Sequence, residues 1–163
     1  MGSMDVRLVG ADAWQTWRDI RLRALQDAPS AFGSTYESEA GFTEQHFRER
    51  LSGGGPAVLA LADGEPVGMG GGFSDLEGWV KVVAMWVEPT WRGRQVGARV
   101  LDLLVGWARE HDLRVHLDVA TDNPLARRFY QRFGFAGTGQ TQPLRPGSAY
   151  LKERMVLPGR WPG

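Results

Sequence analysis

The chain has 163 residues, 42% of them hydrophobic and 23% charged, a composition typical of one globular domain. Its 19 basic and 19 acidic residues cancel, which argues against nucleic acid as a partner, because nucleic-acid-binding proteins usually present a strongly basic face. It has no cysteine, and its three histidines lack the spacing of metal ligands, so we expect no disulfide, no cysteine nucleophile and no metal site.

We expect a single domain over residues 4–158. Residues 1–3, Met1-Gly2-Ser3, look like a vector-derived leader before a native start at Met4, and they are left out of the fold prediction. No signal-peptide pattern opens the chain, and no apolar stretch reaches the ~20 residues that span a bilayer. We therefore expect a cytoplasmic protein without a membrane partner.

The first half of the chain is predicted to contain a strand, two helices and a β-hairpin. Asp12 and Thr43 are suited to cap the two helices, because a short polar side chain can accept from the unpaired N–H groups of a first turn. The Asp63-Gly64 pair predicts the tight turn of the hairpin. The predicted elements cover Val6–Val9, Ala13–Leu25, Thr43–Leu51, Val58–Ala62 and Pro66–Phe73.

The second half alternates strands with helices. The run Val80–Val87 is almost entirely apolar, which predicts a central strand buried on both faces. Asn123 and Pro124 are typical of the N-cap and first position of a helix that Gly134 ends. The order of elements predicts a mixed α/β fold, α+β-like, with an antiparallel first half. The remaining elements are a helix over Val96–Ala108 and strands over Arg114–Ala120, Phe135–Thr141 and Tyr150–Leu157.

A short basic turn joins the central strand to the next helix. Pro89 stops the apolar run, and Arg92-Gly93-Arg94-Gln95-Val96-Gly97-Ala98 leads into the helix. This sequence places two guanidinium groups and several unpaired backbone N–H groups at a helix N-terminus, where the helix dipole favours an anion. The pattern predicts a pyrophosphate site.

Two motifs resemble those of the GCN5-related N-acetyltransferase (GNAT) superfamily. The stretch Arg92-Gly93-Arg94-Gln95-Val96-Gly97, which Val87-x-Pro89 precedes, is similar to the family's Gln/Arg-x-x-Gly-x-Gly/Ala loop. The stretch Asn123-x-x-Ala126-x-x-Phe129-Tyr130-x-x-x-Gly134-Phe135 is similar to its second motif, and the resemblance extends over nearly the whole chain. One position departs from the pattern: Gln95 replaces the middle glycine of the loop. We expect coenzyme A to bind still, with altered affinity.

The resemblance implies the GNAT fold, a mixed sheet of six or seven strands flanked by about four helices, with splayed central strands. It also implies acetyl-CoA as the cosubstrate, its pantetheine arm in the splay and its thioester carbonyl facing the N–H of Val87. Pro89 would help to open the gap, and Asn123 either contacts the pantetheine or acceptor region, acts as a helix cap, or does both. The implied acetyl-CoA-binding residues are Met85, Trp86, Val87, Arg92, Gly93, Arg94, Gln95, Val96, Gly97, Ala98, Asn123, Ala126, Phe129 and Tyr130.

The resemblance also assigns catalytic roles. Tyr130 is the candidate general acid toward the leaving thiolate. An alkylamine, with a pKa of about 10, is protonated at neutral pH, so a base or a chain of water molecules must take a proton. Glu88 is our candidate base, and the alternatives are Glu37, Glu39, His46, Asp118 and ordered water.

Family members usually set acceptor specificity with the first two helices, the loop between them and the loop before the last strand. Here Phe32, Tyr36, Glu37 and Glu39, with residues 143–149, predict a partly aromatic, acidic pocket for a small cationic amine. We expect direct acetyl transfer to the primary amine of a small molecule in a ternary complex. The alternatives are a protein N-terminus or lysine as acceptor, or a non-catalytic coenzyme A-binding sensor domain. A homodimer could cover Trp79 and Trp161.

Overall fold

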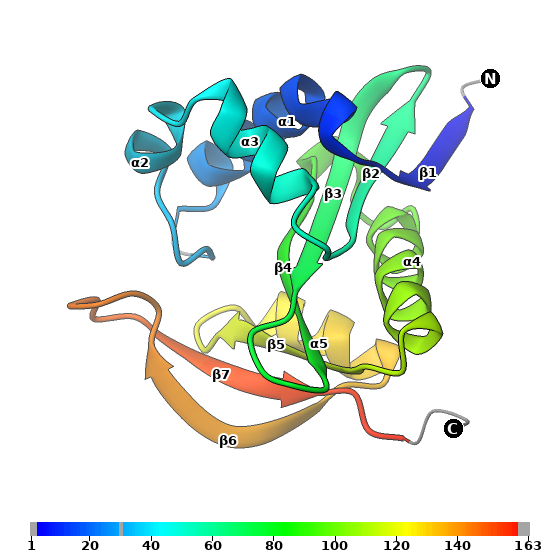
Figure 1. Cartoon of the computed structure of the whole chain (residues 1–163). Helices are drawn as coiled ribbons and strands as arrows, with labels where there is room; N and C mark the ends of the chain where they lie inside the picture. The colour runs from blue at the N-terminus through cyan, green and yellow to red at the C-terminus, as the bar shows by residue number, and fades with distance from the viewer. Residues whose placement is uncertain (1–2, 30, 160–163) are drawn as a thin grey trace.

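We analyse the protein as a computed structural model, which describes residues 3–29 and 31–159. Over these residues seven strands form one sheet in the order β1-β2-β3-β4-β5-β7-β6. The first four strands are antiparallel neighbours, β4 and β5 run parallel, and β7 lies antiparallel between β5 and β6. The mixed sheet with an antiparallel first half confirms the predicted fold class (Figure 1).

The helices and strands have the following bounds. The strands are β1 (Met4–Leu8), β2 (Ala57–Ala62), β3 (Glu65–Phe73), β4 (Trp79–Val87), β5 (Arg114–Ala120), β6 (Ala136–Pro143) and β7 (Leu151–Val156). The α-helices are α1 (Trp14–Asp27), α2 (Tyr36–Ala40), α3 (Glu44–Leu51), α4 (Val96–Glu110) and α5 (Pro124–Phe133), with 3₁₀ turns η1 (Ala11–Ala13) and η2 (Pro89–Trp91). Among the described residues, no helix has the length and apolar character needed to cross a bilayer.

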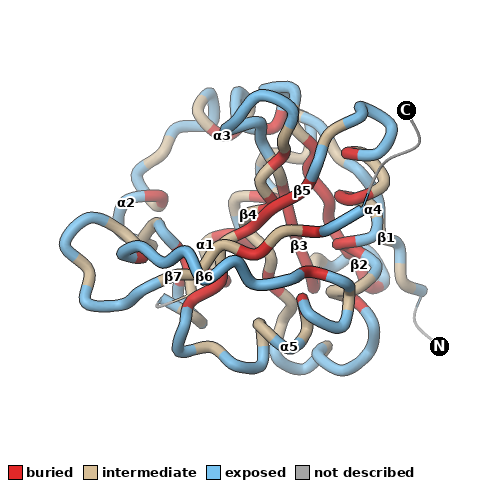
Figure 2. The backbone as a smooth tube through the Cα atoms, turned by 90° about the horizontal axis from the view of Figure 1, so that it is seen from below, coloured by how far each residue is buried: buried red, intermediate tan, exposed pale blue. Residues whose placement is uncertain are grey.

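Helices α1 and α3 pack on one face of the antiparallel half of the sheet. Every residue of β2 is buried, and because successive side chains of a strand point to opposite faces, the strand contributes to two cores. Leu59 belongs to the core on the α1 face, with Ile20 and Phe47, whereas Ala60 belongs to the core on the α4 face. The buried segments run through the middle of the sheet, and β6 at its edge is exposed along its whole length (Figure 2).

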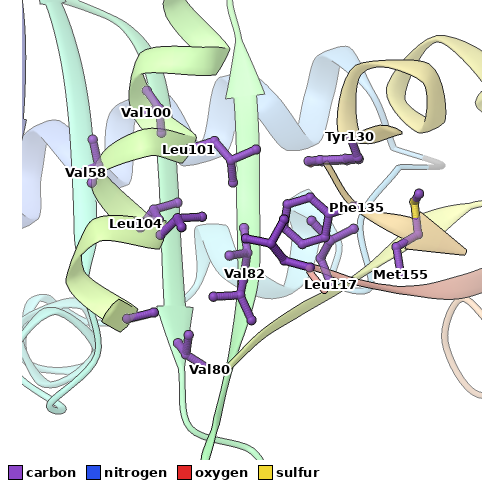
Figure 3. Close-up of a cluster of buried hydrophobic side chains, with 14 of the residues drawn as sticks. Val58, Val80, Val82, Val100, Leu101, Leu104, Leu117, Tyr130, Phe135 and Met155 are labelled. Atoms are coloured by element: carbon purple, nitrogen blue, oxygen red, sulfur yellow. The ribbon is translucent and has the colours of Figure 1, made fainter. Parts of the chain in front are cut away.

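Helices α4 and α5 complete the second core. Val100, Leu101 and Leu104 of α4 pack against the sheet, and Tyr130 of α5 lies beside Phe135 in the same core (Figure 3). The apolar residues of α4 recur at helical spacing, so one face of the helix is buried along its length. This packing fixes the start of α4 against the end of β4, which is the region of the predicted pyrophosphate site.

Local sequence signals are confirmed at several element boundaries. The side chain of Thr43 accepts from the N–H of His46 at the start of α3. The side chain of Asn123 accepts from Ala126 N–H at the start of α5. Asp63 and Gly64 both have positive φ, at 49° and 84°, as a tight hairpin turn between antiparallel strands requires.

The structure corrects two local predictions. Asp12 lies within η1, and the N-cap of α1 is Ala13, which makes no side-chain cap hydrogen bond, so the predicted Asp12 cap is wrong. The short helix α2 was not predicted; Thr35 caps it by accepting from Ser38 N–H. Five residues are too few for a visible 3.6-residue pattern, so tertiary packing decides this helix.

The prediction that β4 is buried on both faces is also wrong. Only Val80, Val82 and Trp86 of this strand are buried, and the residues between them are partly exposed. It is β2 that is buried on both faces. The reason is that part of β4 borders a cavity instead of a helix on the α1 face.

Candidate active site

Strands β4 and β5 are paired only over the first part of β4. The register matches Trp79–Val82 with Arg114–Leu117 and ends there. Against β3, the register places Trp86 opposite Met69 and Val83 opposite Gly71, so β4 carries one extra residue. This bulge contains Ala84, whose φ of 60° is uncommon for a residue with a Cβ. The split between β4 and β5 therefore starts at the bulge, upstream of Pro89, which we expected to help open the gap.

The start of α4 has the features of an anion site. Gly93 has a φ of 76°, and Gln95, the N-cap, has a φ of 68° and forms no side-chain cap hydrogen bond. The first turn of the helix contains no acidic residue. Its unpaired N–H groups and the helix dipole therefore meet an exposed basic turn.

The conformation of Gln95 explains why a glycine suits this position. A left-handed φ costs a residue with a Cβ roughly 1–2 kcal/mol, whereas glycine adopts it freely. Gln95 has φ 68° and ψ 8°, which is left-handed and not the ordinary helical conformation. The substitution therefore places a conformational cost in the loop.

Arg92 is held by its own chain. Its Nε donates to the carbonyl of Val87 at 2.9 Å, and its Nη2 donates to Asp27 Oδ2 at 3.0 Å. The same carboxylate oxygen accepts from the indole N–H of Trp86 at 2.9 Å. Asp27, at the end of α1, thus joins the end of β4 to the basic turn, a role that its place at a helix end did not reveal. Arg94 lies over the ring of Trp91, 4.9 Å from its centroid.

The two sequence motifs meet in space. A Cβ built on Gly97 would lie 3.3 Å from Cζ of Phe129 and 3.6 Å from a methyl group of Val87. The first turn of α4, the middle of α5 and the end of β4 therefore converge, and the lack of a side chain at Gly97 allows the close approach. Gly97 and Phe129, 32 positions apart in the sequence, thus lie together beside the end of β4.

These observations agree with comparisons to known proteins. The model of the acetyltransferase (GNAT) family matches residues 14–135, three quarters of the chain. The chain belongs to the GNAT acetyltransferase family. No curated protein matches the chain significantly.

Solved structures of GNAT proteins share the fold. A GNAT-family acetyltransferase from Streptococcus pneumoniae is 18% identical, with a TM-score of 0.80 over 94% of this chain and 98% of that one. YncA of Salmonella typhimurium, solved with its cofactor acetyl-CoA, is 16% identical, with a TM-score of 0.74 over 94% of this chain and 92% of that one. A nourseothricin acetyltransferase is 27% identical, with a TM-score of 0.58 over 64% of this chain and 66% of that one.

Acetyl-CoA is the cosubstrate of this family. Two features of the described residues fit acetyl-CoA. The strand split next to the bulge leaves β4 without a β5 partner where a pantetheine arm needs backbone groups, and the uncapped start of α4 presents N–H groups where a pyrophosphate needs donors. The individual cofactor contacts of the residues from Met85 to Ala98, and of Asn123, Ala126 and Phe129, stay predictions.

Tyr130 lies on the inner side of α5. Its ring is buried and makes edge contacts with Phe129 and Phe135, with centroids 5.1 Å and 5.9 Å away. Burial raises the pKa of the Tyr130 phenol above its ordinary value. The hydroxyl therefore stays protonated throughout the physiological range and can donate a hydrogen bond, while the raised pKa makes the phenol a weaker acid toward a leaving group.

The candidate bases have different surroundings. Glu88 follows β4 directly and accepts from Arg23 Nη1 at 3.1 Å. Burial alone would raise the pKa of Asp118, but the hydrogen bond and charge of Lys81, with the charge of Lys152, outweigh burial and hold that pKa below its usual value. His46, in α3, stacks on Phe42, which precedes the helix, with ring centroids 3.9 Å apart. A lowered pKa makes a carboxylate a weaker base, so Asp118 is disfavoured.

The two loops predicted to shape the acceptor pocket are in contact. Nη1 of Arg145 donates to the carbonyl of Phe32 at 2.8 Å, and a Cβ on Gly33 would lie 3.4 Å from the carbonyl oxygen of Leu144. Phe32, Gly33 and Leu144 also line a cavity of about 540 Å³ that extends to β4. Tyr36 and Glu37 are not among the lining residues of this cavity.

Glu39 does not form the accessible acidic wall that the sequence predicted. Its side chain is fully buried, and its two oxygens accept from Nε and Nη2 of Arg21 at 3.1 Å and 2.9 Å. Nη1 of Arg50 lies 3.5 Å away. Burial would raise the pKa of Glu39, but Arg21, Ser34 and Arg50 together lower it. The carboxylate thus joins α1, α2 and α3 as an internal ion pair.

Proposed function

We propose that this protein transfers the acetyl group of acetyl-CoA to the primary amine of a small molecule, directly and in a ternary complex. The observation that carries the proposal is the split between β4 and β5, which lies beside the uncapped N-terminus of α4 in a chain of the GNAT family. A cavity next to the same strand leaves room for an acceptor.

The chain's own residues supply the remaining chemistry. Tyr130 is the proposed donor of a proton to the leaving sulfur, because its phenol is neutral and belongs to the second motif. Glu88, which accepts from Arg23, is the proposed base because it directly follows β4, and the cations around Glu39 and Asp118 lower the pKa of those two carboxyls. Arg94 and the N–H groups from Gly93 to Ala98 are proposed to bind the pyrophosphate, and Arg92 to shape the turn as well as add charge.

Two alternatives give different results in the same assays. A protein N-terminus or a lysine as acceptor predicts turnover with peptides and none with free amines. A coenzyme A-binding sensor predicts binding without turnover. Trp79 packs against Arg114 and His116 of its own chain, and Trp161 lies outside the described residues, so a homodimer stays a prediction.

The first experiment is calorimetric titration with acetyl-CoA, followed by thiol release with a panel of amines and peptides. We expect micromolar binding that Arg94→Ala weakens about 10- to 100-fold, since a charge-assisted contact contributes about 1.5–3 kcal/mol. The Arg92→Ala/Arg94→Ala double variant weakens binding further. Arg7→Ala, on the far sheet edge, is the control. Absence of acetyl-CoA binding by the wild type would contradict the proposal.

A further inference from the structure

The cavity beside the split strands has an excess of positive charge. Its walls include residues of α1, α3, β3, β4, β5 and β7 and of the two contacting loops. Its lining contains four cations and two anions, a net charge of +2 that the buried Glu39, paired with Arg21 and Arg50, reduces to +1. The cations are Arg21, Arg50, Lys81 and Lys152, and the anions are Glu49 and Asp118.

The two lysines of the chain meet at one carboxylate in this cavity. Lys81 Nζ lies 2.8 Å and Lys152 Nζ 3.3 Å from Asp118 Oδ2, and Arg154 Nε lies 3.8 Å from Oδ1. Both lysine side chains are more than four-fifths buried, with 17% and 18% of their surface exposed. Within the described residues, no other carboxylate lies within ion-pair distance of either lysine.

The neighbouring acidic residues do not neutralise this cluster. Glu153 lies between Lys152 and Arg154 in β7, but strand alternation turns it to the opposite face, where it pairs with Arg127 of α5. Asp75 pairs with His116. Three cations thus share one carboxylate, and partly buried charges without counter-charges are costly. An anionic ligand would remove this cost.

A second observation, on a different wall, indicates the same kind of ligand. Arg21 is 93% buried, and its guanidinium lies 4.9 Å from the ring centroid of Phe32. Two of its nitrogens donate to Glu39, but Nη1 is buried and has no acceptor within the described part of the chain. A buried donor without an acceptor costs about 1–3 kcal/mol. Such a donor in the wall of a cavity is suited to an anionic oxygen of a ligand.

We propose that the acceptor amine also carries an anionic group, which binds in the cavity that Lys81, Lys152 and Arg21 line. This inference rests on the proposed function and specifies its substrate class. Val83 and Ala84, at the start of the split, line the same cavity as Lys81. Lys81 lies on the part of β4 that pairs with β5, whereas Val87, whose N–H we expect the thioester carbonyl to face, lies at the end of the strand. The anionic group and the reacting nitrogen are therefore expected at opposite ends of an extended acceptor, as in an ω-amino acid or an aminoalkyl phosphate.

The reaction balances with such an acceptor. The ammonium group loses one proton to the base and becomes nucleophilic. Its nitrogen forms a bond to the acetyl carbon, the carbon–sulfur bond breaks, and the nitrogen loses a second proton. The sulfur leaves as the thiol with a proton from Tyr130; one of the two released protons restores Tyr130 and the other passes to the solvent. The anionic group stays unchanged, and it contributes only binding and orientation.

The test compares acceptors that share a five-carbon chain with a terminal primary amine and differ in the group at the other end. They are 5-aminopentanoate, 5-aminopentyl phosphate, neutral pentylamine and dicationic 1,5-diaminopentane. We expect the two anionic acceptors to exceed pentylamine at least 10-fold in kcat/KM, and the diamine to be the poorest. The better of the two anionic acceptors shows whether the site prefers a carboxylate or a phosphate. Equal rates, or a preference for the diamine, would overturn the inference while the thiol release itself upholds the proposed function.

Variants connect the preference to the cluster. Lys81→Met is expected to reduce the ratio of kcat/KM between 5-aminopentanoate and pentylamine to nearly one, and Lys152→Met tests the same contact if Lys81→Met does not fold. Arg7→Met, a cation on β1 whose side chain is 60% exposed, is the matched control and is expected to keep the ratio. An unchanged ratio in both lysine variants would contradict the assignment.

A binding measurement removes the dependence on turnover. Pentanoate has the anionic group but no amine, so it tests the cluster alone. We expect pentanoate to raise the Tm of the wild type and to protect Lys81 and Lys152 from an amine-acylating reagent, read by mass spectrometry. Because these are the only lysines in the sequence, the labelled peptides are unambiguous. Protection in a protein that does not bind acetyl-CoA would reject the proposed function and retain the anion site, whereas no protection rejects the site.

Discussion

Nζ of Lys81 lies 2.8 Å from Oδ2 of Asp118, where the two central parallel strands separate. The pairing of β4 with β5 ends at Val82 and Leu117, so Asp118 is the first residue of β5 beyond it. The ion pair therefore joins the strands just before the split in which we propose that acetyl-CoA binds. It connects the stability of the fold with the charge of the acceptor cavity.

This pair predicts a loss of stability in acid. The pKa of Asp118 is lower in the folded protein than its ordinary value of 3.8, and that of Glu39 is lower than 4.5. A carboxyl with a lowered folded pKa contributes stability at pH values above its unfolded pKa, and this contribution disappears as the pH falls through the folded pKa. We expect the free energy of unfolding to be constant from pH 7 to about pH 5 and to decrease below it.

Asp118→Asn provides the comparison. At pH 7 it removes the counter-charge of two mostly buried lysines, so we expect a loss of about 2–4 kcal/mol. Its unfolding free energy should then depend less on pH below 5 than that of the wild type. Asp5→Asn, with an exposed side chain on β1, is the control. Urea denaturation at each pH measures both effects, and a wild type equally stable at pH 3 and pH 7 contradicts the explanation.

The ion pair of Glu39 predicts that substitutions of Glu39 and of the nearby Glu37 differ in their effect on stability. Glu39→Gln leaves the buried guanidinium of Arg21 without its counter-charge, so it should cost about 3 kcal/mol, or roughly 6–12 °C in Tm for a domain of this size. Glu37→Gln, two residues away on an exposed position, should change stability by less than about 0.5 kcal/mol. Thermal denaturation of both variants measures the difference, and equal Tm values would show that the pair is not structural.

The sequence predicts what is encoded locally. Thr43 and Asn123 signal the starts of α3 and α5, because a cap depends on a side chain and an N–H group three residues apart. The proximity of Gly97 and Phe129 could be expected only from the motif resemblance, since no local pattern relates residues so distant. The basic turn before α4 was recognisable because strand, turn and helix follow each other directly.

What the sequence could not predict depends on contacts between distant segments. The bulge at Ala84 arises from register with β3, and alanine carries no signal for a left-handed φ. Lys81 and Lys152 come together with Asp118 only after β5 pairs with both β4 and β7. Glu39 looked accessible because α2 is too short to show a buried face. Glu39 therefore forms an internal ion pair, and the cavity beside β4 is lined by more cations than anions.

Gln95 provides a prediction in which a substitution improves the protein. Gln95→Gly removes a left-handed cost of roughly 1–2 kcal/mol but adds a glycine entropy cost of roughly 0.5–1 kcal/mol. We expect a net gain of about 0.5 kcal/mol in unfolding free energy and an affinity for acetyl-CoA equal to or higher than that of the wild type. Gln95→Ala retains a Cβ at this φ and should give no gain. If Gln95→Gly is less stable than Gln95→Ala, the left-handed conformation of residue 95 does not cost the free energy assigned to it.

The role of Tyr130 gives the sharpest catalytic prediction. Tyr130→Phe keeps the ring that packs against Phe129 and Phe135 and removes only the hydroxyl. If that hydroxyl protonates the leaving thiolate, kcat should fall about 100-fold, since a positioned acid typically contributes 10²–10⁴-fold. The Kd for acetyl-CoA should stay within about 3-fold, because the donor acts in the transition state. Tyr150→Phe, at a half-exposed position, is the matched control.

A change of leaving group separates proton donation from packing. The coenzyme A thiol is an alkyl thiol and a weaker acid than the cysteine side chain, whose pKa is about 8.5, so its thiolate benefits from a proton as it leaves. An acetyl thioester of a more acidic thiol leaves as a stable thiolate and has little need of an acid. With such an acetyl donor, the ratio of the wild-type rate to the Tyr130→Phe rate should therefore approach one. An equal loss with both thioesters would mean that the phenol only supports the fold around the site, and the acid would have to be sought elsewhere.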